Sequence, residues 1–229
     1  MSPRPYVLAS AACSVDGYLD DASGQRLLLS GAADLDRVDE VRAGVDAILV
    51  GANTIRRDDP RLLVRSERRR AERVRRGLPP SPVRVTMTAS GELDPTARFF
   101  TVGDAARLVY VPSGEAEAVT ARMGSAASVI DAGDPLDLDV LLADLAARGV
   151  RRLMVEGGGR VHTAFLAAGL VDELHLVIAP FLVGDAAAPR FVGPAAFPQD
   201  AANRMTLVET RAVGDCALLR YRIDGAERG

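Results

Sequence analysis

The sequence of 229 residues contains no lysine, only two cysteines and only two histidines. Without lysine, a catalytic Schiff base is excluded. Cys13 and Cys216 each lie in an apolar run, so we expect two buried free thiols in a reducing compartment rather than a disulfide. The spacing of His162 and His175 relative to the two cysteines is not that of a zinc site, so no metal site is expected. We interpret both histidines as helix-packing or strand residues rather than as bases.

Long apolar stretches are missing as well. No run could span a bilayer, and residues 1–10 lack a signal-peptide pattern. A formal net charge of −3 gives no overall attraction to nucleic acid or to an anionic membrane. No H-x-E motif is combined with P-C-x-x-C, so no nucleobase deaminase is expected. With 48% hydrophobic residues the chain can bury a full core, and we expect one cytoplasmic domain over 1–229.

Apolar runs alternate with helix-like segments along the chain, which predicts an α/β fold with a mostly parallel central sheet flanked by helices. Strands are expected at 6–13, 45–50, 83–87, 108–111, 128–131, 152–155 and 173–180. Helices are expected at 32–42, around 115–123, at 138–148 and at 160–168. The last two runs, 205–213 and 217–223, flank Gly214-Asp215 and predict a C-terminal antiparallel hairpin.

Polar groups of several kinds follow the buried strand expected at 45–50. Thr54 and Asp58 come shortly after it, and Pro60 prevents a helix from continuing past them. We therefore expect a sharp turn that presents these two side chains beyond the carboxyl end of the strand. Ligands bind at that edge of open α/β sheets.

The segment 65–82 is rich in arginine, interleaved with glutamate, and closes with Gly77 and a proline cluster. A nucleic-acid patch is one interpretation, but no aromatic side chains are interleaved for base stacking. We therefore favour a solvated helix or a mobile loop.

A second informative stretch runs from 153 to 169. A strand leads into Glu156 and three glycines, 157–159, before the expected helix. Such glycines let backbone N–H groups close around an anion at a helix N-terminus, and a tight strand-to-helix turn is the other interpretation. Glu156 is best explained as an acceptor for an N–H or O–H group of a ligand.

Three motifs in this order resemble the pyrimidine reductases of riboflavin biosynthesis. They are ACSVDGYLD near the start, VGANTIRRDDPRLLVR in the middle and VEGGGRVHTAFLAAGLVDELHLVIAPFLVG toward the end. The resemblance covers essentially the whole chain and extends to the reductase domain of the bifunctional deaminase-reductase and to its stand-alone counterparts. It implies a dihydrofolate-reductase-like α/β fold, a homodimer and NADPH as the cofactor.

The resemblance also implies residue roles. Positions at the nicotinamide cofactor are matched by Ala12, Thr54, Asp58, Gly158, Gly159, Arg160 and Val161. Positions that hold a ribosylated aminopyrimidine 5′-phosphate are matched by Arg42, Leu62, Arg65 and Glu156. Arginine forks suit a phosphate, and a carboxylate suits the amino groups of the pyrimidine.

The implied reaction opens the ribosylamine to an imine, which accepts hydride at ribose C1′ and becomes a ribitylamine. Asp58 is the candidate for stabilising the cationic imine. Arg56, Arg57 and Arg160 are cations available for the 2′-phosphate that distinguishes NADPH from NADH.

Two alternatives stay open, because Tyr18 stands where the family usually carries lysine or arginine. One is a reductase of the same fold that acts on another heterocycle, such as a pterin, dihydrofolate or a natural-product intermediate. The other is a nucleotide-binding module without catalysis.

Overall fold

The computed structural model describes residues 4–23 and 27–223. The chain divides into two compact units. Unit 1 comprises Met1–Pro5 and Asp39–Met154, and unit 2 comprises Tyr6–Val38 and Val155–Gly229. Each unit is therefore built from two stretches of the chain, and the single domain expected from the sequence stays a prediction.

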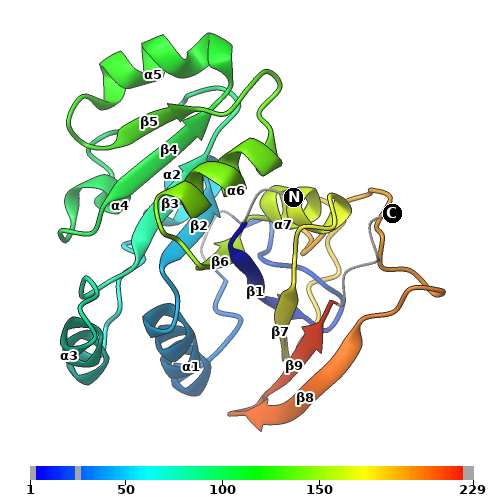
Figure 1. Ribbon diagram of the computed structural model, residues 1–229. Coiled ribbons are helices and arrows are strands. Elements are labelled where there is room, and N and C mark those ends of the chain that lie inside the picture. The colour runs from blue at the N-terminus through cyan, green and yellow to red at the C-terminus, as the bar shows by residue number, and fades with distance from the viewer. Residues whose placement is uncertain (1–3, 24–26, 224–229) are drawn as a thin grey trace. The chain divides into compact units, whose positions relative to one another are not determined.

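Unit 1 contains four strands that pair in parallel in the order β5-β4-β3-β2 (Figure 1). They are β2 (Ala47–Gly51), β3 (Val83–Met87), β4 (Arg107–Val111) and β5 (Ser128–Asp131). Every residue of β2 is buried, as expected for a parallel strand that is covered on both faces.

The helices of unit 1 follow these strands. They are α2 (Ala52–Asp58), α3 (Glu67–Arg75), α4 (Arg98–Thr101), α5 (Ala116–Met123), which follows the 3₁₀ turn η1 (Ser113–Glu115), and α6 (Leu138–Ala147). Helix α6 starts where the side chain of Asp137 accepts hydrogen bonds from the N–H groups of Asp139 and Val140. It buries Leu141, Leu142 and Leu145 in the core.

In unit 2 the strand order is β1-β7-β9-β8. Strand β1 (Tyr6–Ser14) pairs in parallel with β7 (Glu173–Ala179), which pairs antiparallel with β9 (Cys216–Arg222). Strand β8 (Thr206–Val213) completes the C-terminal hairpin, and α7 (Gly159–Ala167) is the helix that lies wholly in this unit. Two elements, α1 (Ala32–Ala43) and β6 (Arg152–Gly157), continue from one unit into the other.

The expected α/β class, with mostly parallel strands and a C-terminal antiparallel hairpin, is confirmed. Cys13 and Cys216 are buried free thiols, as expected. Among the described residues, no helix has both the length and the apolar character needed to cross a membrane.

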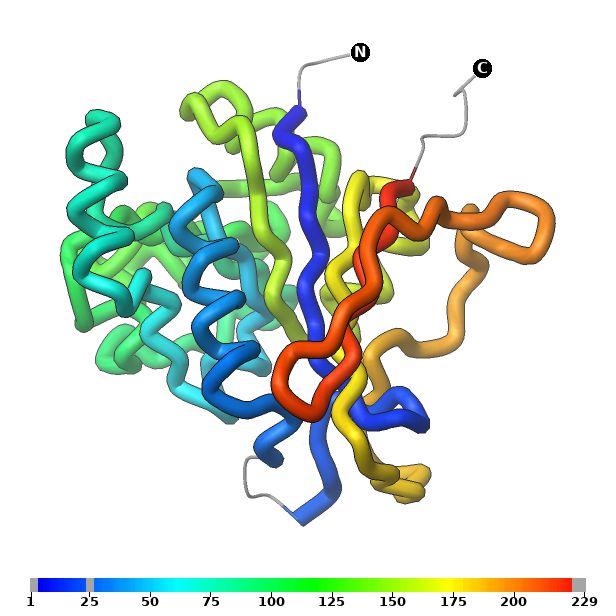
Figure 2. Tube along the Cα trace, turned by 90° about the horizontal axis from the view of Figure 1, so that it is seen from below, coloured from blue at the N-terminus to red at the C-terminus, as the bar shows by residue number. Residues whose placement is uncertain are grey.

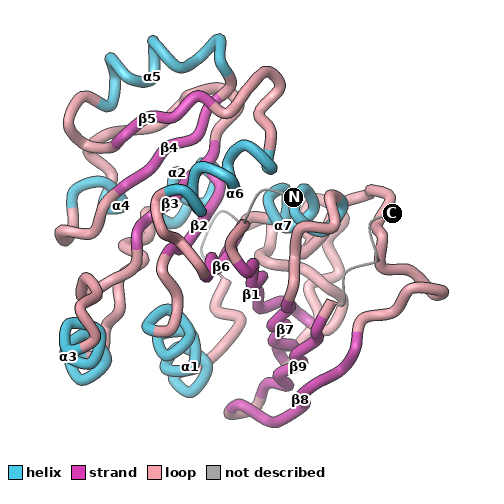
Figure 3. Tube along the Cα trace, viewed as in Figure 1, coloured by secondary structure: helices cyan, strands magenta, loops and turns pink. Residues whose placement is uncertain are grey.

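Helices α2 and α4 are absent from the sequence prediction. We expected a sharp turn directly after Gly51, but the chain first forms α2 and turns only at Asp59. The physical reason is that Pro60 disfavours helical backbone at the residue before it and cannot itself continue the helix, but leaves the residues up to Asp58 free to form one. Figure 3 draws the connection between α2 and α3 as loop.

The arginine-rich segment forms helix α3, which is one of the two forms we expected. It is less solvated than expected, because Arg73 is buried and donates to the carbonyl groups of Ala43 and Val45 at 2.9 and 2.8 Å. These bonds tie α3 to the C-terminal end of α1 and to the chain that follows it.

We expect Gly91 to be among the least replaceable glycines of unit 1. Its φ is 64°, and an added Cβ would lie 2.4 Å from Cγ2 of Val119, whereas Gly77 has a φ of 75° and nothing within 4 Å of such an atom. Gly77→Ala should cost about 1 kcal/mol from backbone strain alone, and Gly91→Ala about 2 to 4 kcal/mol because overpacking adds to it. Urea unfolding of both variants measures the difference, and equal losses would contradict this account.

Candidate functional site

Helix α2 presents two of the predicted site residues on one face. Thr54 and Asp58 are four residues apart, so their side chains lie one above the other on the helix. Thr54 is half-buried and Asp58 is exposed. Because α2 follows β2 directly, both side chains stand beyond the carboxyl end of a buried strand, as predicted.

The connection between α2 and α3 contains two residues with a left-handed backbone, Asp59 (φ 40°) and Leu62 (φ 49°). Asp59 ends α2, and its carboxylate accepts the N–H of Arg98 at 2.6 Å, where α4 begins. Leu62 is a predicted substrate residue, and its side chain is buried, with 3% exposure. A leucine in this region is strained, so the surrounding structure must hold it there.

Two buried side chains hold this connection from the β3 side. Arg84 donates to the carbonyl oxygens of Arg61 at 3.4 Å and of Phe99 at 2.5 Å, and Ser81 Oγ accepts the N–H of Val64 at 3.1 Å. Burial, and then the neighbouring Arg107, lowers the pKa of Arg84 to about 10, so this arginine still carries its charge at neutral pH.

A third buried side chain, Asp39 on α1, holds the end of the connection. Its carboxylate accepts the N–H groups of Arg65 and Ser66. Sequence reasoning missed Asp39, Ser81 and Arg84. Arg84 left a visible signal, because it is a charged residue inside an apolar strand run, whereas Asp39 and Ser81 did not.

In unit 2 the glycines lie at the start of α7. Gly158 has a φ of 84°, and its carbonyl accepts the N–H groups of Val161 and His162. The N–H groups of Gly159 and Arg160 begin the helix, where no intrahelical acceptor exists. Such a helix start suits a phosphate group.

Gly159 also has a packing role. A Cβ at this position would lie 2.2 Å from the carbonyl oxygen of Arg190, so only glycine fits here. The two interpretations of the glycine stretch are thus compatible, because the tight turn is what brings the helix start close to the segment 189–191.

The segment 189–191 also forms hydrogen bonds with the loop after β1. Leu19 donates its N–H to the carbonyl of Pro189 at 2.8 Å, and Phe191 donates to that of Gly17 at 2.9 Å. The Arg190 guanidinium lies over the Tyr18 ring, with Cζ 4.5 Å from the centroid, and its Nη2 donates to the Tyr18 hydroxyl at 2.8 Å. Nothing in the sequence had indicated Arg190.

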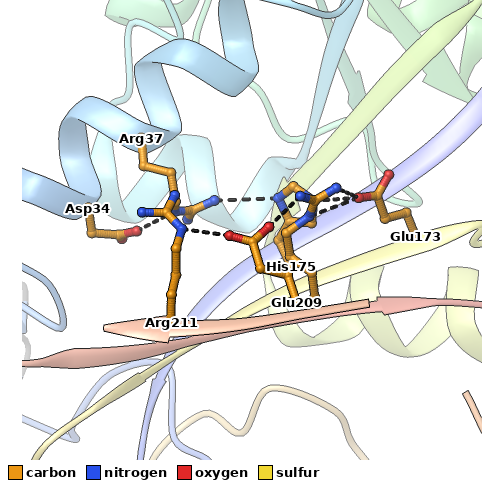
Figure 4. A network of polar contacts seen from close by, with 7 residues as sticks. Asp34, Arg37, Glu173, His175, Glu209 and Arg211 are labelled. Atoms are coloured by element: carbon orange, nitrogen blue, oxygen red, sulfur yellow. Dashed lines mark hydrogen bonds and ion pairs between the residues drawn. The ribbon is translucent and has the colours of Figure 1, made fainter. Parts of the chain in front are cut away.

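His162 lies on α7 and His175 on β7, the helix and the strand in which we expected them. His162 is buried against Phe191, with ring centroids 5.2 Å apart, and neither of its ring nitrogens has a hydrogen-bond partner among the described residues. His175 lies 2.8 Å (Nε2 to Oε1) from Glu173, in a network that reaches Arg37 and Arg220 (Figure 4). The His175 hydrogen bond, and secondarily Arg220, outweighs burial and lowers the pKa of Glu173 to about 2.

The predicted site residues fall into two sets. Unit 1 holds Arg42, Thr54, Asp58, Leu62 and Arg65. Unit 2 holds Ala12 on β1, Glu156 on β6, and Gly158, Gly159, Arg160 and Val161 at the start of α7. Of the cations considered for a 2′-phosphate, Arg56 donates to the carbonyl of Glu92 at 2.7 Å, and Arg160 is exposed.

The match to a known protein family includes all of the predicted site residues. The model of the RibD C-terminal domain family matches residues 5–219. The chain belongs to the RibD C-terminal domain family. This membership covers both units and every predicted site residue.

Relatives with assigned names are similar over most of their length. A 2,5-diamino-6-ribosylamino-4(3H)-pyrimidinone 5′-phosphate reductase of Archaeoglobus fulgidus is 39% identical over 188 residues, which cover 81% of this chain and 85% of the relative. A protein of the same name from Methanothermobacter thermautotrophicus is 35% identical over 224 residues, covering 97% of this chain and 100% of the relative.

Solved structures share the fold. A pyrimidine reductase-like protein from Corynebacterium diphtheriae superposes with a TM-score of 0.80 at 24% identity, covering 96% of this chain and 92% of that one. RibD from Acinetobacter baumannii gives a TM-score of 0.77 at 25% identity, with 96% of this chain and 58% of that one covered.

We expect His162 to make the protein less stable in acid. Burial lowers its pKa to about 4, whereas an exposed histidine titrates near about 6.5. Between these pH values the unfolded chain binds one proton more than the folded chain, so the free energy of unfolding falls as pH is lowered, by up to about 1.4 kcal/mol per pH unit.

The variant His162→Leu should lose this component and show a shallower decline of stability in urea unfolding over that pH range. Phe165→Leu, which alters packing in the same helix and keeps the histidine, serves as the control and should decline as the wild type does. Parallel curves for His162→Leu and the wild type would refute the assignment.

Proposed function

We propose that this protein is an NADPH-dependent reductase that converts the ribosylamino group of a phosphorylated aminopyrimidine into a ribitylamino group. The observation that carries the proposal is the 35–39% identity, over 81–97% of this chain, to relatives named as the corresponding pyrimidinone phosphate reductase. The residues of both sets fit the chemistry that such a reaction needs. The reaction itself, the cofactor and the residue roles are proposals.

The residues at the start of α7 fit a dinucleotide. The N–H groups of Gly159 and Arg160 lack intrahelical acceptors, the helix dipole favours negative charge there, and Arg160 adds an exposed cation. When bound, NADPH would supply the hydride. We assign its binding to Ala12, Thr54, Asp58, Gly158, Gly159, Arg160 and Val161.

The substrate is assigned to Arg42, Leu62, Arg65 and Glu156. Guanidinium groups bind a phosphate through paired hydrogen bonds, and a carboxylate accepts hydrogen bonds from amino groups of the pyrimidine. The task of these residues is to hold ribose C1′ at about 3 to 3.5 Å from the hydride donor, since positioning alone can lower a barrier by several kcal/mol. Asp58, exposed on α2, is proposed to stabilise the positive charge on the imine nitrogen before C1′ accepts the hydride.

The first test is turnover. Purified protein mixed with NADPH and the ribosylaminopyrimidinone 5′-phosphate should oxidise the cofactor, seen as loss of NADPH absorbance, and should give one ribitylamine per NADPH by mass spectrometry. Dihydrofolate in the same assay should give no oxidation. Turnover of dihydrofolate alone would favour the other heterocycle, and NADPH binding without oxidation by either compound would favour the non-catalytic module.

The second test concerns Asp58. Asp58→Asn keeps the shape and one hydrogen-bond acceptor oxygen for the cofactor but removes the charge, so kcat should fall about 10- to 100-fold while the Kd for NADPH stays within about twofold. Glu117→Gln, an exposed carboxylate of α5, is the control and should leave both constants unchanged. Unchanged kcat in Asp58→Asn would remove Asp58 from the catalytic role.

A further inference from the structure

We propose that Asp39 is a positioning residue that holds Arg65 at a fixed place relative to Arg42, so that both guanidinium groups reach one phosphate group of the substrate. The inference rests on the proposed function and deepens it. It takes the phosphate of that substrate as given and assigns the spacing of the two arginines to a residue outside the recognised motifs.

The contacts of Asp39 are directed at the main chain of the loop end. Its Oδ1 accepts the N–H of Arg65 at 2.5 Å, and its Oδ2 accepts the N–H of Ser66 at 3.1 Å. Oδ2 also accepts a hydrogen bond from Nη1 of Arg69 at 3.0 Å. By contrast, Nε of Arg65 lies 3.8 Å from Oδ1, so the side chain of Arg65 is held much less closely than its main chain.

Burial makes these bonds hard to replace. The Asp39 side chain is 2% exposed, whereas that of Arg65 is 55% exposed. A buried carboxylate needs hydrogen-bond donors, because water cannot reach it. Two consecutive main-chain N–H groups and a guanidinium supply them. Burial by itself would raise the pKa of Asp39, but these donors hold it below its usual value, so the residue is ionised at neutral pH.

The position of Asp39 on α1 gives these bonds a consequence for Arg42. The two residues are three apart in the last turns of the helix and therefore neighbour each other on its surface. One carboxylate thus connects the helix turn that carries Arg42 to the residue that carries the second guanidinium. The tubes of α1 and α3 run side by side in Figure 2. The ion pair between Asp39 and Arg69, at 3.0 Å, joins the two helices.

The rest of the connection supports the same fixed arrangement. Leu62, three residues before Arg65, keeps a strained left-handed backbone, and Val64 is bonded to Ser81. Arg70 on α3 donates to the carbonyl of Val64 at 3.2 Å and to that of Arg65 at 2.7 Å. The main chain of Arg65 is therefore held through both its N–H and its carbonyl group, although it lies outside helices and strands.

Asp39→Asn tests the proposal. An amide has one acceptor oxygen in place of two, so it can bond one of the two N–H groups and must turn its NH₂ toward the other. We expect the KM for the ribosylaminopyrimidinone 5′-phosphate to rise at least about tenfold, with kcat and the KM for NADPH within about twofold. With the same compound lacking its 5′-phosphate, the KM of the variant should equal that of the wild type.

Asp46→Asn is the matched control, because Asp46 of unit 1 also accepts two consecutive main-chain N–H groups, those of Arg151 and Arg152, both at 2.9 Å. It should lower the unfolding midpoint without changing either KM. If Asp39→Asn does not fold, Arg69→Gln removes the ion pair to the Asp39 carboxylate and leaves the main-chain hydrogen bonds of that carboxylate in place. We then expect the KM for the phosphorylated compound to increase about threefold.

The outcomes separate the two proposals. Equal KM increases with and without the 5′-phosphate, or no increase with it, would overturn the role of Asp39 and leave the proposed function intact. If the wild type binds the phosphorylated compound in calorimetry but does not reduce it, the proposed function fails. In that case the role of Asp39 is tested by the Kd values of the wild type and of Asp39→Asn for the compound with and without its 5′-phosphate. Equal increases for both compounds, or no increase for the phosphorylated one, would overturn it.

Discussion

Charged side chains that are buried in a protein must be surrounded by hydrogen-bond partners, because their loss of hydration is otherwise too costly. In unit 1 this constraint is met by main-chain groups of loops and of helix ends. Asp39 binds two N–H groups at the end of the α2–α3 connection, Arg84 binds the carbonyls of Arg61 and Phe99, and Arg73 binds those of Ala43 and Val45. The irregular segments of unit 1 are therefore held by its core.

This arrangement explains how a connection without regular structure can keep a strained residue. Leu62 has a left-handed backbone and a buried side chain. Hydrogen bonds to the main chain before it and after it hold the backbone in this conformation. In unit 2 a tight approach has the same effect, because the carbonyl of Arg190 lies where any side chain at position 159 would have to be. In both units, backbone that only a few residues tolerate lies among the residues assigned to ligand binding.

The two histidines of unit 2 differ in their hydrogen bonding. His175 shares a hydrogen-bonded network with Glu173, Arg37 and Arg220, so its polar atoms are satisfied inside the sheet. His162 packs as an apolar ring and lacks hydrogen-bond partners among the described residues. The two rings therefore differ in whether their nitrogens have hydrogen-bond partners among the described residues.

The sequence by itself determined the α/β class, every strand among the described residues, the C-terminal hairpin and the motifs that carry the family resemblance, because hydrophobic periodicity and turn residues are local signals. It could not determine that helix α2 puts Thr54 and Asp58 on one face, nor that Asp39, Ser81 and Arg84 hold the segment that contains Leu62 and Arg65. Ser81 is 17 positions from its main-chain partner in this segment, and Asp39 is 26 and 27 positions from its two partners. Only the tertiary structure brings such partners together, because a carboxylate or hydroxyl in the sequence does not specify which distant N–H group it will accept.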